Sequence, residues 1–347
     1  MPWRKTIDEG KGKSLYYVDY RMKRFFLLLI IMFVCTYVVQ AQNDVRFSWN
    51  NMAIGYYNPA SAGRSGNLDV TAMYNIGMLG WNNAPKTLLV SADMPFYFMK
   101  KEHGVGVVVT SDNQSSMYKD LSAGFQYAFL KKIGKGKLRV GFQLGMISRS
   151  VDGSNAITPD DIISGETGGS GSSGGAGGTD EAIPTSVVES KIFDANLGLY
   201  YATDKWYVGV AVMHLLEPEI EEENLNTFIE RGYNFTGGYN IRMSNPLFEL
   251  QPSVFVRTNF NMYQVDVTAR AVYARKYSAG LSWRSGDAIT LLLGSIFGKI
   301  EGGYAYSVPI TAMIRGSFGG HELYIKYRMQ LNKPKTGISR HKSVRIL

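Results

Sequence analysis

Charged side chains stand at alternate positions in several short segments of this chain, where the residues between them are apolar. In residues 68–76 every second residue is apolar, and Asp69, Thr71, Met73 and Asn75 lie between them. Acids and bases occupy such polar positions in near balance, whereas a strongly selective ion pore favours one sign of charge. These residues are Asp69, Asp93, Asp112, Asp194, Glu249, Asp266, Glu322, Arg139, Arg257, Arg270, Arg284, Lys326 and Arg328.

The remaining reactive side chains do not form a catalytic pattern. The four histidines, at 103, 214, 321 and 341, lack metal-ligand spacing, and no serine lies in an elbow motif. Glycines 168–178 lack the lysine of a phosphate-binding loop. The acidic run 217–223 fits a solvated loop better than a site for divalent ions. We therefore expect no enzyme, catalytic residue, metal or cofactor. A lipid-acting enzyme that assembles its site from distant strands is kept as an alternative.

Alternation of this kind places side chains on the two faces of a β-strand. An even number of segments, each near ten residues and with one apolar face, is typical of a bacterial barrel in a membrane. The sequence predicts an all-β, antiparallel, up-and-down transmembrane β-barrel of about 14 strands, in which Pro252 costs the ninth strand a ladder hydrogen bond. The strands are expected at 68–76, 88–94, 105–112, 121–129 and 138–148, and from Phe193, Trp206, Tyr233, Phe248, Tyr263, Tyr277, Ile289, Tyr304 and Glu322 onward.

The first 41 residues predict a secretory signal peptide. Arg24 precedes an apolar run over 25–39, and Ala41 provides a small residue at the cleavage point. The run is shorter than the roughly 20 residues that a spanning helix needs. Met22 would begin an ordinary signal peptide, so residues 1–21 come from an upstream start codon or form an unusually long n-region.

Composition limits the partners and the chemistry of the exported chain. Its only cysteine, Cys35, falls within the signal peptide, which excludes disulfides and thiol chemistry afterwards. The whole chain has a net charge of +8, and removal of residues 1–41 leaves +4, spread along the sequence. Such weak and dispersed charge predicts no nucleic-acid partner.

The connections between the predicted strands alternate in length. Those after even-numbered strands are short and rich in Lys and Arg, whereas several after odd-numbered strands are long. The loop 151–190 is rich in Gly and Ser and is expected to be flexible. This alternation predicts an integral outer-membrane protein with both termini in the periplasm. The exported chain then consists of a periplasmic segment at 42–66, the barrel at 67–330 and a basic periplasmic tail at 331–347.

Small residues recur among the inward positions and leave room for large neighbours or for an inserted segment. They are Gly106, Gly141, Gly145, Gly198, Gly209 and Gly280. Separately, the near balance of acids and bases favours a largely closed lumen over a diffusion pore. The expected lumen polar network comprises Asp69, Asp194, Glu249, Asp266, Arg139, Arg257, Arg270 and Arg284.

Two motifs resemble those of a known family. Residues 47–63 contain Asn-Pro-Ala and Ala-Gly, and residues 319–328 contain His-Glu and Tyr-Arg. Both resemble signatures of the PorP/SprF family, outer-membrane barrels of the type IX secretion system of Bacteroidota. Ser61 departs from the aromatic residue that is common in the family. The resemblance suggests partner contacts at Asn58, Pro59, Ala60, Gly63, His321, Glu322, Tyr327 and Arg328. The first four fit equally well a plain turn in which Pro fixes φ and Gly63 adopts a positive φ.

The resemblance also implies a function. It points to a non-enzymatic barrel of the type IX secretion and gliding machinery that supports export or surface display of sorting-domain proteins. Members of the family link the outer membrane to a periplasmic lipoprotein and to the machinery ring, and the basic tail is suitably placed for such a contact. The alternative is an outer-membrane porin or hydrophobic-solute channel.

Overall fold

The computed structural model describes residues 45–81, 83–115, 118–152, 187–222, 225–311 and 316–331. Residues Asn43–Leu347 form one compact unit, and the description below concerns this unit alone. The predicted signal peptide, most of the loop 151–190 and the tail from residue 332 lie outside the described residues.

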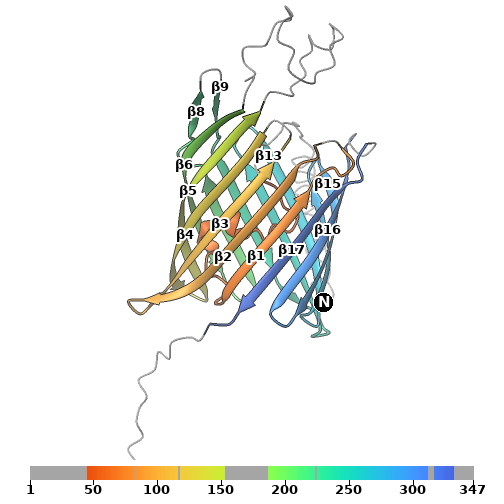
Figure 1. The fold of residues 1–347 in the computed structure, drawn as a ribbon. Coiled ribbons are helices and arrows are strands. Elements are labelled where there is room, and N and C mark those ends of the chain that lie inside the picture. The colour runs from red at the N-terminus through yellow and green to blue at the C-terminus, as the bar shows by residue number, and fades with distance from the viewer. Residues whose placement is uncertain are drawn as a thin grey trace, which may run out of the picture. The chain divides into compact units, whose positions relative to one another are not determined.

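Strands make up nearly all of the regular structure, and Figure 1 shows them forming a barrel. The alternation seen in the sequence explains their formation, because it gives each strand one apolar and one polar face. Their bounds are β1 Leu68–Ile76, β2 Lys86–Phe98, β3 Lys101–Asn113, β4 Tyr118–Ile133, β5 Gly136–Asp152, β6 Val187–Ala202, β7 Trp206–Met213, β8 Glu219–Glu222, β9 Leu225–Phe228, β10 Gly232–Tyr239, β11 Ile241–Arg242, β12 Phe248–Thr258, β13 Tyr263–Tyr273, β14 Tyr277–Arg284, β15 Ala288–Phe297, β16 Ile300–Pro309 and β17 Gly320–Met329.

Fourteen of these strands close into a ring. Neighbouring strands pair antiparallel, β10 pairs with β12, and β1 pairs with β17 from Leu68 opposite Met329 to Ile76 opposite His321. The short β11 pairs with β12 as one extra strand, and β8 and β9 form a separate hairpin. The predicted all-β antiparallel barrel of about 14 strands is therefore confirmed.

Pro252 marks the place where one strand is interrupted. It lies in β12, and the adjoining strand breaks between Tyr239 at the end of β10 and Ile241 at the start of β11. The gap falls opposite Gln251 and Pro252, between the pairs Gly238–Ser253 and Ile241–Leu250. Proline has no N–H to donate, so the ladder weakens there.

The two faces of the barrel differ in the way that the alternation predicts. Large apolar residues are exposed on the outward face, among them Leu88, Val107, Phe125, Leu144 and Leu281. Buried polar residues such as Asp69, Gln126 and Asp266 lie on the inward face. An apolar outer band around a polar interior is the arrangement that a membrane barrel requires. Among the described residues, none of the helices is long and apolar enough to cross a membrane.

The two ends of the barrel carry different connections. At the short-turn rim, two or three residues connect β2 to β3, β4 to β5, β6 to β7, β13 to β14 and β15 to β16. At the opposite, long-loop rim, longer stretches of sequence separate β1 from β2, β5 from β6, β7 from β10 and β16 from β17. β1 begins and β17 ends at the short-turn rim, where Leu68 pairs with Met329.

One side of the wall is much taller than the rest. β5 has 17 residues and β4 and β6 have 16 each, whereas β7 and β14 have 8. At roughly 3.4 Å per residue, the longest strand exceeds the shortest by about 30 Å. Since a membrane crossing takes about 9–11 residues, β4 to β6 are long enough to extend beyond the bilayer. Figure 1 shows these long strands side by side in the wall.

Candidate functional site

Residues 45–66 fold into the lumen and are called the plug here. They include the helical turn α2 (Ile54–Tyr57) and the 3-10 turn η1 (Pro59–Ser61). Phe47 and Tyr57 are each 1% exposed, and the plug bonds to residues of β2, β5, β6, β10, β12 and β17. Only a segment inside the ring can reach strands on all sides of it. The segment expected in the periplasm at 42–66 therefore lies, from residue 45 onward, within the barrel.

The plug runs through the lumen from rim to rim. Near the long-loop rim, Arg257 donates to the Val45 carbonyl at 2.9 Å, and Arg46 lies 3.8 Å from Asp287 in the β14–β15 turn. The plug then leads into β1 at the short-turn rim. The first described residue thus lies at the rim opposite the end of β17. Both ends of the exported chain lie outside the described residues, so their expected place in the periplasm stays a prediction.

The Asn-Pro-Ala motif forms the tightest contact between the plug and the wall. The Asn58 side chain accepts a bond from the Ala60 N–H at 2.9 Å and donates to the carbonyls of Leu199 at 3.0 Å and Val210 at 3.3 Å. Pro59 takes the first position of η1, where a missing N–H costs nothing. Asn58 is 2% exposed and Ala60 0%. Their side chains are covered by the wall and hold the plug.

Glycines in the wall make this close approach possible. A Cβ at Gly198 would overlap the Asn58 side chain, one at Gly141 the Ala60 backbone, and one at Gly104 the Ala62 carbonyl. A Cβ at Gly209 would lie 3.0 Å from Asn58 Nδ2. The expectation that inward glycines admit an inserted segment applies to Gly141, Gly198 and Gly209. Gly106, Gly145 and Gly280 instead adjoin neighbouring residues of the wall.

Glu322 on β17 anchors the opposite part of the plug. Its carboxylate accepts the backbone N–H of Ser48 at 2.6 Å and that of Trp49 at 2.9 Å. Two residues further along β17, the Tyr324 ring meets the Trp49 ring edge-on, with centroids 4.8 Å apart. Glu322 thus supplies the acceptor for two buried backbone N–H groups of the plug.

The other residues of the second motif divide between the two faces of β17. Arg328 faces inward and bonds to Asp69 at 3.0 Å. His321 accepts or donates a 2.6 Å hydrogen bond with Tyr304, and Tyr327 is 40% exposed. Of the eight motif residues, Asn58, Pro59, Ala60, Gly63 and Glu322 thus meet at the plug–wall interface, whereas His321 and Tyr327 do not.

A third anchor holds the end of the plug before β1. Gly63 has a φ of 69°, a conformation that favours glycine, and its N–H donates to Asp93 at 2.8 Å. Arg139 donates to the carbonyls of Ala62 at 3.0 Å and Gly63 at 3.2 Å, and to Glu102 at 3.0 Å. Arg139 is 3% exposed, so the exit of the plug is fixed by buried, charge-assisted bonds.

The rest of the expected lumen network pairs locally. Asp266 bonds to Arg284 at 3.1 Å, Asp194 to His214 at 2.9 Å, and Glu249 lies 3.7 Å from Arg275. Arg257 and Arg270 lie over the rings of Tyr57 and Trp49, both in the plug. Because the plug occupies the axis, wall charges meet nearby wall residues or the plug and do not pair across an open lumen.

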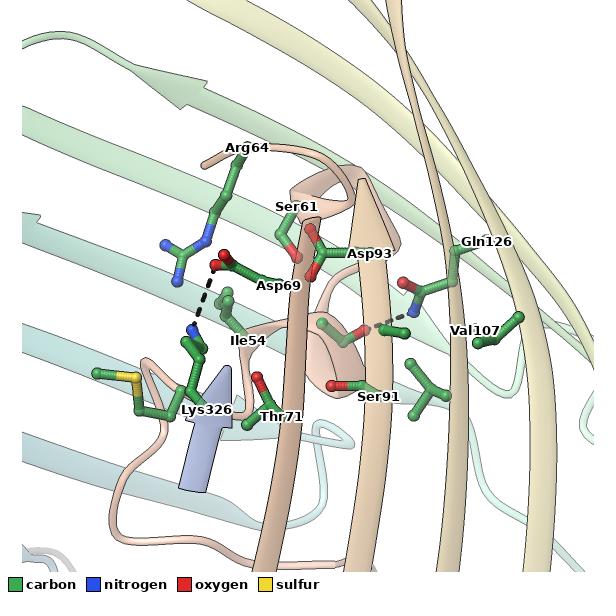
Figure 2. A pocket seen from close by; sticks show the side chains of 14 residues that line it. Ile54, Ser61, Arg64, Asp69, Thr71, Ser91, Asp93, Val107, Gln126 and Lys326 are labelled. Carbon is green, nitrogen blue, oxygen red and sulfur yellow. Dashed lines mark hydrogen bonds and ion pairs between the residues drawn. The ribbon is translucent and has the colours of Figure 1, made fainter. Parts of the chain in front are cut away.

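Little space remains where the plug meets β1 to β4. A cavity of about 20 Å³ lies there. Figure 2 shows Lys326 directed at Asp69 beside it, and Gln126 donates to the plug at the Gly55 carbonyl. Lys326 Nζ lies 3.7 Å from Asp69, and both side chains are less than 10% exposed. The cavity has room for about one or two waters, so this part of the lumen is filled.

Several strands carry apolar residues at inward positions, where the alternation predicts polar ones, and these residues indicate the plug. Met73, on the expected polar face of β1, is 1% exposed and packs in one cluster with Phe47, Trp49 and Tyr57. Apolar residues occupy further inward positions in this cluster, namely Leu89, Val108, Phe255, Leu292 and Tyr324. Apolar residues that would face water inside the lumen indicate an apolar segment packed against them. Here these residues pack against one side of the plug.

Among the residues that the structure describes, no group of three or more His, Cys, Asp or Glu could hold a metal ion. The buried carboxylates in the lumen accept bonds from arginines, lysine or plug amides.

A closed antiparallel barrel with an apolar outer band, whose own N-terminal segment fills its lumen, defines the class of plugged membrane barrels. The model of one family, the type IX secretion system membrane protein PorP/SprF, matches residues 39–327. This chain belongs to that family. It is a membrane protein of the type IX secretion system family, as the two motifs suggested. No curated protein matches the sequence.

Several solved structures share a distant similarity with the chain. The toluene transporter TodX of P. putida is 11% identical, with a TM-score of 0.42 over 80% of this chain and 93% of that one. The Ralstonia pickettii toluene transporter TbuX is 13% identical, with a TM-score of 0.44 over 81% and 94%. The KdgM porin with a disordered oligogalacturonate is 8% identical, with a TM-score of 0.32 over 76% and 99%. At such identities and scores, these similarities say nothing of what this chain binds.

Proposed function

We propose that this protein is a non-enzymatic, integral outer-membrane component of the type IX secretion and gliding machinery. In this proposal it supports export or surface display of proteins with a C-terminal sorting domain and links the outer membrane to periplasmic components. Membership of the PorP/SprF family supports a role in the secretion machinery. The plug across the lumen supports a scaffold and not a channel through which molecules pass.

The plug that lies across the lumen is the observation that carries the proposal. Asn58, Glu322 and Arg139 hold the plug at three separate places along its path. A diffusion pore needs a continuous watery passage, and here the plug spans the lumen from one rim to the other. The barrel then offers its partners two rims and an outer surface.

The shapes of the two rims suggest which partners meet them. Short turns are typical of the periplasmic side, and this rim is rich in bases such as Lys132, Lys135, Lys205 and Lys276. We assign it to the periplasm, where a lipoprotein and the machinery ring would dock. The tall wall of β4 to β6 then stands at the cell surface and is available to sorting-domain proteins.

Deletion of the gene tests the secretion role. The expected result is loss of surface display for a subset of sorting-domain proteins, restored by the wild-type gene, with uptake of small solutes unchanged. A deletion strain that displays every such protein normally would contradict the proposal. An epitope-tagged copy purified in mild detergent distinguishes two versions of the role. A co-purifying peptidoglycan-binding lipoprotein favours the core machinery, and a giant adhesin favours a dedicated partner.

Planar-bilayer recording tests the scaffold against the channel alternative. The purified barrel is expected to show no steady conductance, whereas a variant that lacks residues 45–66 should conduct. A large, steady conductance of the wild-type barrel would favour a porin or solute channel. Lipid A and phospholipid profiles of the deletion strain should match the wild type, and a changed profile would favour the lipid-acting enzyme.

A further inference from the structure

A second and larger cavity separates the plug from the wall on the side opposite the small one. Its volume is about 260 Å³, and it adjoins β7, β10, β12, β13 and β15. Trp49 and Arg64 line it from the plug, and Tyr207, Tyr239 and Arg270 line it from the wall. A single water needs only about 10–15 Å³, so this space admits a small organic molecule.

The charge of this cavity is one-sided. Arg64 and Arg270 line it, and no acidic residue does. Arg64 donates to the Tyr200 hydroxyl at 3.3 Å and to the Asn51 carbonyl at 2.9 Å, and Arg270 donates to the Gln251 side chain at 2.6 Å. All three acceptors are neutral. By contrast, Arg139, Arg149, Arg284 and Arg328 all bond to carboxylates.

One buried donor without a partner belongs to a residue of the same cavity. Among the described residues, the Trp49 indole N–H has no hydrogen-bond partner, and Trp49 lines the space. Trp49 is only 2% exposed, so its N–H is shut off from bulk water. A buried donor without an acceptor is costly, and a bound oxyanion would provide one.

We propose that this cavity binds a small organic anion. The carboxylate or phosphate of this ligand lies between Arg64 and Arg270, because guanidinium groups bind the oxygens of both kinds of acid. The same group accepts a hydrogen bond from the Trp49 N–H. A flat apolar body lies against the Tyr207 ring. The ligand enters from the short-turn rim, where Tyr239 ends β10 and where the Arg64 side chain is exposed. This solute site goes beyond the secretion role, which needs no small ligand.

Calorimetry on the purified full-length barrel in detergent tests the site. The probes are benzoate, phenyl phosphate and the neutral benzyl alcohol. At least one anion is expected to bind at least tenfold more tightly than the alcohol. Tighter binding of benzoate would indicate a carboxylate ligand, and tighter binding of phenyl phosphate would indicate a phosphate ligand. Arg270→Gln should weaken binding of the tighter-binding anion at least tenfold. Arg275→Gln, which removes the same charge from a residue 81% exposed and outside the cavity, should leave it unchanged.

Three results would overturn the proposal: neither anion binds, the alcohol binds as tightly, or Arg270→Gln binds like the wild type. The heat-dependent shift of folded barrels on gels shows whether each variant is folded. If Arg270→Gln does not fold, Arg64→Gln replaces it with the same expected loss. The outcome is independent of the secretion role, which the deletion strain tests separately.

Discussion

Gly141 in β5 lies directly against Ala60 in the plug, so that any side chain at position 141 would overlap the Ala60 backbone. The contact joins a strand in the middle of the barrel to a turn that the chain forms about 80 residues earlier. The wall and the plug are therefore sterically complementary at this contact.

Replacing Gly141 by valine should therefore expel the plug and leave the barrel closed. The overlap should weaken the binding of the plug inside the barrel by roughly 1–3 kcal/mol, as at other overpacked contacts. Limited proteolysis should cut the variant within residues 45–66, and bilayer recordings should show new conductance. Gly237→Val is the matched control, because a Cβ there meets only ordinary contacts at 3.8 Å. Equal protease resistance of the two variants would count against the seating role of Gly141.

Loss of the Glu322 carboxylate should loosen the plug near Trp49. Glu322→Ala leaves two buried N–H groups without an acceptor, which costs about 1–3 kcal/mol for each. Hydrogen exchange of the peptide around residues 45–52 should become faster by at least tenfold. Glu249→Gln removes an inward carboxylate that pairs with Arg275 and should leave this peptide protected. Unchanged exchange in Glu322→Ala would show that other contacts suffice to hold the segment.

Two substitutions at Asn58 separate its roles as acceptor and donor. Asn58→Asp keeps the acceptor for the Ala60 N–H but sets a carboxylate against the carbonyls of Leu199 and Val210. Asn58→Ala loses both roles without adding a buried charge. We expect the aspartate variant to be cut faster by protease within the plug, because an unpaired buried charge costs more than a lost hydrogen bond. The opposite order would mean that the turn matters more than the bonds to the wall.

Asp69 should contribute strongly to stability through Lys326. Asp69→Asn leaves the Lys326 charge buried and without its partner at 3.7 Å, and breaking a buried pair costs about 3–5 kcal/mol. It also removes the partner of Arg328 at 3.0 Å, but Arg328 is 42% exposed and retains Glu301 at 3.9 Å. Unfolding by denaturant in lipid vesicles measures the loss, and Asp69→Asn with Lys326→Met should recover most of it. Glu189→Gln breaks the exposed pair with Lys191, whose side chains are 54% and 67% exposed. It should cost about 0–1 kcal/mol. Similar losses for Asp69→Asn and Glu189→Gln would contradict the prediction.

The strands could be predicted closely because each one repeats the same two-faced pattern. The predicted starts at Trp206, Phe248, Tyr263 and Tyr277 agree with β7, β12, β13 and β14. β6 begins at Val187, six residues before the predicted Phe193. Glu189 and Lys191 lie on its outward face there, because this part of the strand stands clear of lipid and has no need of an apolar face.

The plug could not be predicted in the same way. Its bonds depend on which strands a closed ring brings together, and Ser48 and Glu322 are 274 positions apart in the sequence. Local propensity carries no information about such a pair. The inward glycines at 141, 198 and 209 indicated room, and Met73 and Leu292 indicated an apolar partner inside. Only the closed barrel shows that residues 45–66 meet both conditions.

Glu322 belongs to the last strand that the ribosome makes, and it fastens residues that emerge among the first. The ring can close between β1 and β17 only after that strand exists, so the seat of the plug is incomplete in every shortened chain. The plug can therefore be fully seated only when the first and last strands of the barrel have paired. Closure of the ring and closure of the lumen depend on the same final strand.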